Sequence, residues 1–181
     1  MVAIHSITAV GAACAACSVA SATVISFTKT FQNTTSSAQT YEYFVALPIT
    51  GQFPSPAISG SITATLIDLN GNGALLTQAA PASPVYSAMI AGNQVHSMWG
   101  NGFTLSTGAY GTATQPSQRF DNLPITIAQA GDMMELRIRL TLSARDMVTI
   151  GTNFSVVPAP GALAALACAA GFAGSTRRRR A

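Results

Sequence analysis

The segment Met134-Glu-Leu-Arg-Ile-Arg-Leu-Thr-Leu142 alternates strictly between apolar and polar side chains. Successive side chains of a β-strand point to opposite faces, so this pattern predicts a strand with one buried and one solvated face. We expect the apolar positions to pack into a hydrophobic core and Arg137 and Arg139 to share the outward face.

Segments of similar character occur on both sides of this strand. They are rich in β-branched and aromatic residues or alternate in the same way, and they cover residues 23–31, 41–47, 58–69, 85–90, 95–99, 147–150 and 154–157. Turn-forming residues separate them and predict a hairpin connection over residues 33–39, a tight hairpin over 91–94 and a turn over 143–146. No long segment of this region shows the 3.6-residue period of an amphipathic helix. The pattern predicts an all-β domain over residues 23–156, an antiparallel β-sandwich of immunoglobulin-like or jelly-roll-like type.

The composition narrows the class of protein. Only 8% of the 181 residues are charged and 49% are hydrophobic, which excludes a disordered or collagen-like chain. The net charge of +3 comes from four arginines near the C-terminus, because the rest of the chain has five basic and six acidic residues. A nucleic-acid interface needs basic residues spread over one face with aromatic residues beside them, so we expect no nucleic-acid partner.

Residues 1–22 have the pattern of a secretory signal peptide. An apolar run from Ile7 to Cys17 precedes Ala20-Ser-Ala22, where Ala20 and Ala22 fit the small-x-small pattern that signal peptidase accepts. The usual basic residue ahead of the apolar run is missing, because the first Lys or Arg is Lys29. Either the leader is truncated at its start or the signal is weak; the alternative is a buried first strand of the domain.

Residues 157–181 combine three features in order. These are the sequence Val157-Pro158-Ala159-Pro160-Gly161-Ala162, an apolar stretch over residues 161–174, and the run Arg177-Arg178-Arg179-Arg180. As a hydrophobic helix the apolar stretch would be about 21 Å long, short of the ~30 Å hydrocarbon core of a bilayer. Because arginines cross lipid only at high cost, we expect them to stay in the cytoplasm and the segment to anchor the chain transiently.

This order resembles the C-terminal sorting signal of PEP-CTERM proteins, in the variant that reads Val-Pro-Ala-Pro-Gly-Ala. The resemblance covers residues 157–181 and implies an exosortase-like membrane protease that recognises Pro158-Ala-Pro160 and removes the tail. It further implies transient retention at the inner membrane, delivery to the cell surface or extracellular matrix, and exopolysaccharide or matrix proteins as partners. Ala159 stands where the commonest signal has Glu, which leaves open which enzyme variant would read it. The alternatives are an ordinary tail anchor or a basic disordered end.

The three cysteines fall in the two terminal segments. Cys14 and Cys17 lie in the expected leader and Cys168 lies in the expected tail. A doubly processed domain would therefore contain no cysteine and no disulfide. A redox or metal role for the Cys14–Cys17 pair is not expected, because no second pair accompanies it.

Asp68, Asn70 and Asn72 resemble the start of a calcium-binding loop. Such a loop needs a bidentate acid at its twelfth position, which here is Ala79, so the three residues would bind calcium poorly. Two consecutive Asn-Gly pairs suit a turn equally well, and we favour the turn. No cofactor and no metal are expected.

The sequence contains no recognisable catalytic constellation. The only histidine outside the leader is His96, for which we expect a hydrogen-bonded structural role, and the carboxylates are scattered. We therefore expect a non-enzymatic exported protein. The alternative is a secreted carbohydrate-binding or carbohydrate-active domain, which predicts a carboxylate pair in a cleft or an aromatic platform of Tyr86, Trp99 and Tyr110 on one outer face.

Two further patterns concern the surface. The outward pair Arg137 and Arg139 would either bind an acidic polysaccharide or, as we prefer, keep an exposed sheet face soluble. Asn33-Thr-Thr35 and Asn153-Phe-Ser155 match the acceptor pattern for N-glycosylation.

Overall fold

The computed structural model describes residues 22–50, 55–126, 128–129 and 131–158. Within these residues the protein is built of ten β-strands joined by turns, with no helix, so the all-β prediction is confirmed. The strands are β1 (Thr23–Gln32), β2 (Gln39–Pro48), β3 (Pro56–Asp68), β4 (Ala74–Gln78), β5 (Tyr86–Ile90), β6 (Asn93–Met98), β7 (Thr104–Thr107), β8 (Thr112–Pro124), β9 (Met133–Leu142) and β10 (Asp146–Pro158). The helix predicted within residues 161–174 lies outside the described residues.

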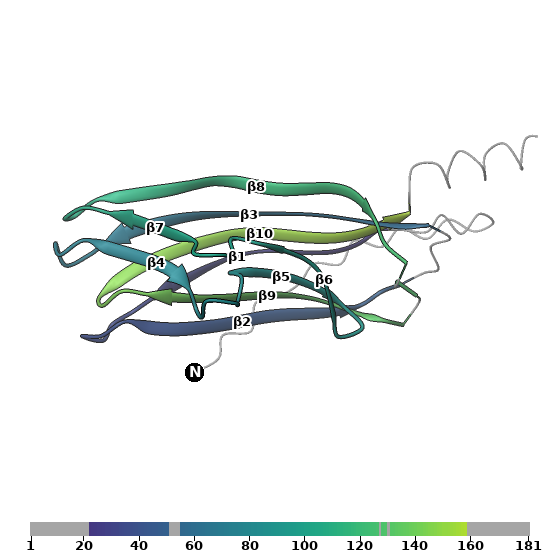
Figure 1. Ribbon diagram of the computed structural model, residues 1–181, viewed down its shortest axis with the longest axis horizontal. Coiled ribbons are helices and arrows are strands. Elements are labelled where there is room, and N and C mark those ends of the chain that lie inside the picture. The colour runs from purple at the N-terminus through teal and green to yellow at the C-terminus, as the bar shows by residue number, and fades with distance from the viewer. Residues whose placement is uncertain (1–21, 51–54, 127, 130, 159–181) are drawn as a thin grey trace, which may run out of the picture.

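The strands form two antiparallel sheets (Figure 1). The first has the order β1-β10-β3-β8. In the second, β9 pairs with β2 along one edge, and its other edge is shared by β4 and β5. The short strands β7 and β6 continue this sheet beyond β4 and β5, respectively. Each sheet is thus four positions wide.

The pairing of the strands is nested along the chain. β1 pairs with β10, β2 with β9, β3 with β8, β4 with β7 and β5 with β6. The chain is therefore one long antiparallel ribbon that closes at the β5–β6 turn, and the first four pairs alternate between the two sheets. Most contacts that define the fold consequently join residues far apart in the sequence.

The predicted connections have mixed outcomes. The tight hairpin is confirmed, since Ile90 pairs with Asn93 across Ala91 and Gly92. The hairpin connection predicted over residues 33–39 is wrong, because β1 and β2 lie in different sheets and this segment crosses between them. The turn at residues 143–146 also crosses between sheets, from β9 to β10. A strand that buries one face must find a partner beside it in its own layer, and that partner need not be its neighbour in sequence.

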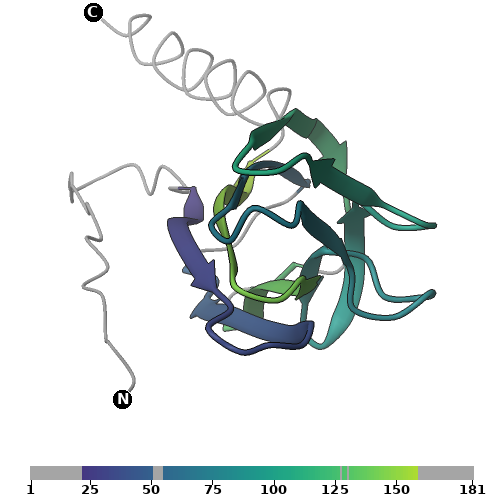
Figure 2. The ribbon, with the colours of Figure 1, turned by 90° about the vertical axis from the view of Figure 1, so that its left-hand side faces the viewer.

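Figure 2 shows the two sheets end-on, and their inner faces bury one hydrophobic core. The alternation of the opening segment is confirmed, because its apolar members, Met134, Leu136, Ile138, Leu140 and Leu142, have no exposed surface. Opposite them lie buried residues of β3 and β10, among them Ile62, Leu66, Ile150 and Phe154. Removing this apolar surface from water is the main force that holds the layers together.

Aromatic pairs cover the edge of the core between β1 and β2. The rings of Phe27 and Tyr43 meet edge to face at 5.1 Å between centroids. The rings of Phe31 and Tyr41 lie 5.5 Å apart. Each pair has one residue on β1 and one on β2. Among the described residues no hydrogen-bond ladder joins β1 to β2, so these aromatic contacts connect the two sheets at this edge.

The first and last strands of the domain lie side by side, so its N- and C-terminal ends are adjacent. Thr23 at the start of β1 pairs with Val156, and β10 continues to Pro158, which pairs with Pro56. The last strand thus extends two residues beyond the predicted boundary at residue 156, and Val157 and Pro158 belong to the sheet.

Candidate functional site

A cleft of about 620 Å³ lies between the edge strands β6 and β8, a volume within the usual range of ligand sites. We call it the β6–β8 cleft; it is defined by Gln94 and Ser97 on β6, the loop of residues 99–103, and Gln115 and Gln118 on β8. β8 is an edge strand of the first sheet and β6 is an edge strand of the second, and within the described residues no β-ladder joins these two edges.

A β-bulge brings the two glutamines of β8 to the same side. Residues three apart in a regular strand point to opposite faces. Here, however, Gln118 pairs with Ile62 and Gln115 pairs with Ala64, so β8 contains one more residue than β3 between these pairs. Ile62 and Ala64 are buried residues two apart on the inner face of β3, and cross-strand partners share a face. Gln115 and Gln118 therefore both lie on the core-facing side of β8 at its open edge, where Gln115 is half-buried and Gln118 is exposed.

The loop that follows β6 is held in an unusual backbone conformation. Trp99 and Asn101 have positive φ angles of 55° and 53°, and Gly102 has 86°. A positive φ is uncommon for a residue with a side chain and is an outlier for a bulky one such as Trp. The indole of Trp99 stacks on Phe103, with ring centroids 4.7 Å apart and planes within 4°. Trp99 itself is buried, so the pair forms an apolar wall rather than an exposed platform.

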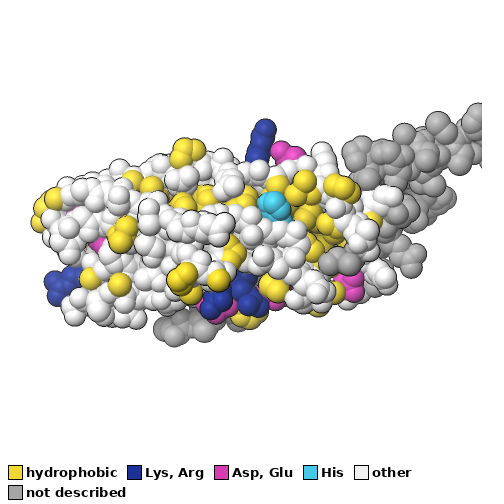
Figure 3. All heavy atoms as spheres, in the orientation of Figure 1, with side chains coloured by type: hydrophobic (Ala, Val, Ile, Leu, Met, Phe, Trp, Pro, Cys, Tyr) yellow, Lys and Arg dark blue, Asp and Glu magenta, His cyan; other side chains and the backbone are white. Residues whose placement is uncertain are grey.

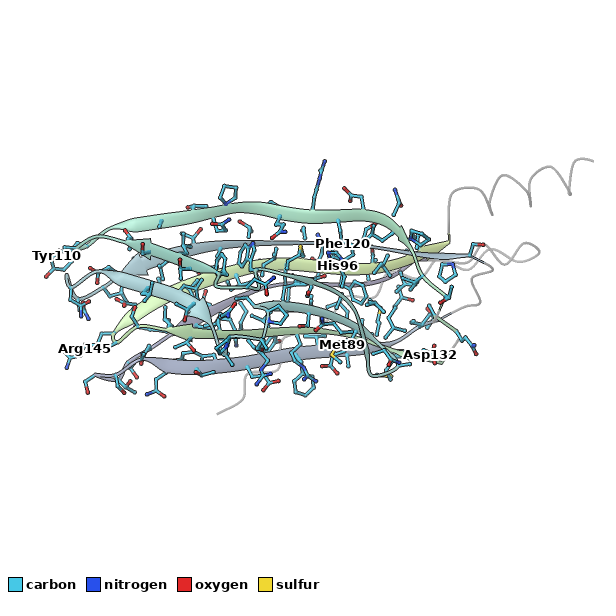
Figure 4. The ribbon with its side chains drawn as sticks, viewed as in Figure 1. Met89, His96, Tyr110, Phe120, Asp132 and Arg145 are labelled. Carbon is cyan, nitrogen blue, oxygen red and sulfur yellow. The ribbon has the colours of Figure 1, made fainter. Side chains whose placement is uncertain are left out.

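His96 packs against an aromatic ring, but among the described residues its side chain makes none of the hydrogen bonds that we expected. Its ring lies 4.0 Å from that of Phe120, between the two edge strands (Figure 4). Burial lowers the pKa of this imidazole, because an apolar environment disfavours the charged form. Figure 3 shows the imidazole at the surface beside hydrophobic side chains, on a face with few charges.

The lining of the β6–β8 cleft contains no Asp, Glu, Lys, Arg or His among the described residues. The carboxylates of the domain lie elsewhere, and each makes at least one polar contact, although the buried Oδ1 of Asp146 has no hydrogen-bond partner among the described residues. Asp121 forms an ion pair with Arg119, and both Glu42 and Glu135 form ion pairs with Arg137. Asp132 accepts a hydrogen bond from the backbone N–H of Gln129, and Asp146 accepts one from the Ser143 hydroxyl. Asp68 accepts hydrogen bonds from backbone N–H groups. None of the described carboxylates lines the cleft.

The geometry around Asp68 favours the turn over the calcium loop. Its Oδ1 accepts from the N–H groups of Asn70 and Gly71 (both 3.0 Å), and its Oδ2 accepts from those of Gly73 (2.9 Å) and Tyr110 (2.8 Å). Burial alone would raise the pKa of Asp68, but these hydrogen bonds outweigh it and lower the pKa to about 2.

The side chain of Asn70 also stabilises the turn. The Oδ1 of Asn70 accepts from the N–H of Asn72 (3.0 Å), and its Nδ2 donates to the carbonyl of Ala144 (2.9 Å). Among the described residues no group of three or more His, Cys, Asp or Glu side chains could hold a metal ion.

The aromatic residues predicted as a sugar platform do not lie together. Tyr86 is completely buried, and its hydroxyl donates to the carbonyl of Asn153 (3.0 Å). Tyr110 is 76% exposed but lies on the β7–β8 turn at the far end of the domain (Figure 4). Only Trp99 lines the cleft. Local alternation could not bring these residues together or apart, because Tyr86 lies on β5, Trp99 follows β6 and Tyr110 lies in the β7–β8 turn.

The outward arginines of β9 are paired with acids. Arg137 contacts Glu135 (2.7 Å) and Glu42 (3.5 Å), and Arg139 contacts Glu42 (3.7 Å). This face is therefore close to charge balance, which favours the solubility interpretation over binding of an acidic polysaccharide.

The asparagines of the two N-glycosylation patterns differ in solvent exposure. Asn33 is completely buried, and its Nδ2 donates to the carbonyls of Ser37 (2.8 Å), Leu142 (3.1 Å) and Ser143 (2.9 Å). Asn153 is exposed on β10 and donates to the hydroxyl of Ser61 (2.9 Å). Only Asn153 could accept a glycan without unfolding of its surroundings.

Most residues of the predicted leader and of the predicted sorting signal lie outside the described part of the chain. This holds for Ala20, for residues 159–162 of the sorting motif and for Arg177 to Arg180. Ala22 is exposed just before β1, and Val157 and Pro158 end β10. In the part of the chain that the structure describes, no helix is long and apolar enough to cross a membrane.

Comparisons with protein-family profiles, with curated proteins and with solved structures give no match to this chain.

Proposed function

We propose that this protein is an exported, non-enzymatic surface or extracellular-matrix protein that is sorted by its C-terminal segment. A leader is removed after Ala22, the tail anchors the chain briefly at the inner membrane, and an exosortase-like protease cuts near Pro158-Ala-Pro160. The motif of residues 157–162, the apolar stretch and Arg177 to Arg180, in this order, support the sorting step. Exopolysaccharide is the proposed matrix partner.

The observation that carries this proposal is the adjacency of the two ends of the domain. Thr23 pairs with Val156, so the leader and the tail leave the domain from the same end. Two cuts at that end would release the complete antiparallel ribbon without removing a core residue. The lining of the β6–β8 cleft, which holds no carboxylate among the described residues, supports a role without catalysis.

We further propose that the fold is jelly-roll-like rather than immunoglobulin-like. The nested pairing of β1–β10, β2–β9, β3–β8 and β4–β7 supports this assignment, because a jelly roll is a folded antiparallel ribbon of two Greek keys.

Carbohydrate binding is the second candidate function, and the β6–β8 cleft favours it. Its neutral amide lining suits sugar hydroxyls. The carbohydrate-active form of this candidate has less support, since glycosidases need two carboxyl groups at the bond that they cleave.

The intact mass of the protein recovered outside the cells tests the sorting proposal. The full gene is expressed in a bacterium that carries an exosortase, beside a variant in which Arg177 to Arg180 are all glutamine. The wild-type product should begin at residue 23 and end within residues 157–162. The variant should keep its tail, because nothing then holds the short apolar segment in the membrane for cleavage.

Arg145→Gln is the matched control, since it removes one arginine from an exposed turn and should be processed like the wild type. Full-length wild-type protein in the cytosol, or normal processing of the four-glutamine variant, would contradict the proposal.

A further inference from the structure

Gln115 and Gln118 present two uncommitted amide groups to the β6–β8 cleft. Gln115 uses its backbone carbonyl to accept from the Thr63 hydroxyl (3.1 Å), and neither glutamine amide makes a side-chain hydrogen bond within the described residues. The same holds for Gln94 and Asn101 on the other side of the cleft. Other amides of this domain, such as those of Asn33 and Asn70, are used to tie loops together.

The chemistry of these groups points to a class of ligand. A primary amide has two donors and one acceptor, and a hydroxyl can both donate and accept. Two amides on one face can therefore bond neighbouring hydroxyls of a sugar ring. Because no ionisable side chain lines the cleft among the described residues, a charged ligand would lose its hydration there without gaining a counter-ion.

The backbone around the cleft supports a binding role. The β8 bulge turns Gln115 and Gln118 to one side, and bulges are over-represented next to functional sites, where they re-aim side chains. Positive φ angles also occur at Ala91, Tyr110, Asn122 and Arg145 outside the cleft lining, but Trp99 is the bulkiest residue to adopt one, and backbone strain of this kind clusters at ligand sites. Phe103, half-buried against the indole of Trp99, offers an apolar surface for the C–H face of a sugar.

From these observations we propose that the β6–β8 cleft binds a neutral oligosaccharide, with Gln115 and Gln118 as its hydrogen-bonding pair. This deepens the proposed function by naming the site and the class of matrix polysaccharide that it recognises.

An extended peptide is the competing ligand, since it could add a strand to an open sheet edge. Such addition needs a continuous row of free backbone N–H and C=O groups. Next to the cleft, β8 contains Pro116, which has no N–H, together with the bulge. The edge is interrupted where a peptide would pair, which favours the sugar.

Trp99 provides the readout, because it is the single tryptophan of the chain and lies in the cleft. The purified full-length chain, in a detergent without a sugar headgroup, is titrated by fluorescence with cellohexaose, maltohexaose, xylohexaose and mannohexaose up to roughly 10 mM, since weak sites have Kd values near 1 mM. Hexagalacturonate and a neutral strand-forming hexapeptide are titrated in parallel. We expect one or more neutral sugars to shift the emission, with a Kd that 0.5 M salt leaves unchanged within about twofold, because no charges are paired.

The variants Gln115→Ala and Gln118→Ala should each weaken binding by about tenfold, since each removes one or two hydrogen bonds. Gln32→Ala is the matched control, because Gln32 is exposed on β1, away from the cleft, and should bind like the wild type. Thermal melting of all three variants establishes that they are folded.

The proposal is overturned if no neutral sugar in the panel binds, if the hexagalacturonate or the peptide binds more tightly, or if folded Gln115→Ala and Gln118→Ala variants keep wild-type affinity. These outcomes are independent of the sorting proposal, because the titration uses purified protein and the mass measurement does not involve the cleft.

Discussion

The carboxylate of Asp68 accepts a hydrogen bond from the backbone N–H of Tyr110, 42 residues later in the chain (2.8 Å). This bond joins the β3–β4 corner to the β7–β8 turn. At the same end of the domain, Asn70 donates to Ala144 and Asn33 donates to Ser143, which adds the β9–β10 turn and the β1–β2 crossover. Four connections of the ribbon are thereby held together by buried or half-buried polar side chains.

The first prediction concerns the pH dependence that Asp68 confers. The hydrogen bonds lower its pKa from the usual 3.8 to about 2, so the folded state favours the ionised form. This stabilisation should be complete above about pH 4 and should be lost as the pH falls towards 2. Asp68→Asn should be less stable than wild type at pH 7, because its amide donors would face the N–H groups of Gly73 and Tyr110. The gap between the two urea midpoints should narrow between pH 4 and pH 2.

Parallel urea midpoints for wild type and Asp68→Asn over this whole pH range would show that the carboxylate charge makes no contribution.

A second prediction compares the two asparagines of the glycosylation patterns. Asn33→Ala should lower the free energy of unfolding by about 3 kcal/mol, because it leaves carbonyls of Leu142 and Ser143 without a donor in a buried position. Asn153→Ala removes one exposed hydrogen bond to Ser61 and should cost less than about 1 kcal/mol. Chemical denaturation of both variants measures the difference. Equal losses for the two would mean that Asn33 does not join the crossover to the β9–β10 turn.

Tyr86 supplies a third prediction. Its buried hydroxyl donates to Asn153, and burial raises its pKa far above the usual value. Tyr86→Phe should lower the free energy of unfolding by about 1–2 kcal/mol, through the lost bond and the unpaired carbonyl. Tyr110→Phe, at an exposed position, should change it by less than about 0.5 kcal/mol. If Tyr86→Phe is as stable as wild type in thermal melting, the hydroxyl bond does not stabilise the fold.

The fourth prediction tests the close packing over Gly60. A Cβ added there would lie 2.5 Å from the Tyr86 hydroxyl and 2.7 Å from the ring of Phe120. Gly60→Ala should therefore destabilise the domain by about 1–3 kcal/mol through overpacking. At Gly108 an added Cβ meets nothing within 4 Å, so Gly108→Ala should leave the melting temperature nearly unchanged. A neutral or stabilising effect of Gly60→Ala would contradict this packing.

Strands with a strong alternation could be read from the sequence, as β9 and β3 show. One face of each of these strands is buried, so apolar residues recur at every second position whichever strands lie beside it. β8 could not be read in this way. As an edge strand it tolerates polar residues and Pro116, and its bulges interrupt the alternation. β4 and β7 are too short for a periodic signal.

The sequence likewise predicted one part of the candidate sites and not another. Turn chemistry indicated that Asp68, Asn70 and Asn72 form a turn, because the glycine of an Asn-Gly pair readily adopts positive φ, as Gly71 and Gly73 do. The β6–β8 cleft was not predicted. Its two sides are separated along the chain, and the inward direction of Gln118 depends on one extra residue in β8. A proline between two glutamines three apart, in an otherwise β-rich polar segment, is the signal that could have suggested a bulge.

The sequence by itself determined that the domain is all-β and which faces of its strongest strands are buried, because side-chain alternation and local turn preferences are properties of neighbouring residues. Tertiary structure alone decided the partners of each strand, the adjacency of Thr23 and Val156, and the meeting of β6 and β8 at a cleft. These features depend on hydrogen-bond ladders and core contacts between distant segments. Local sequence carries no record of them, since many pairings would bury the same apolar faces.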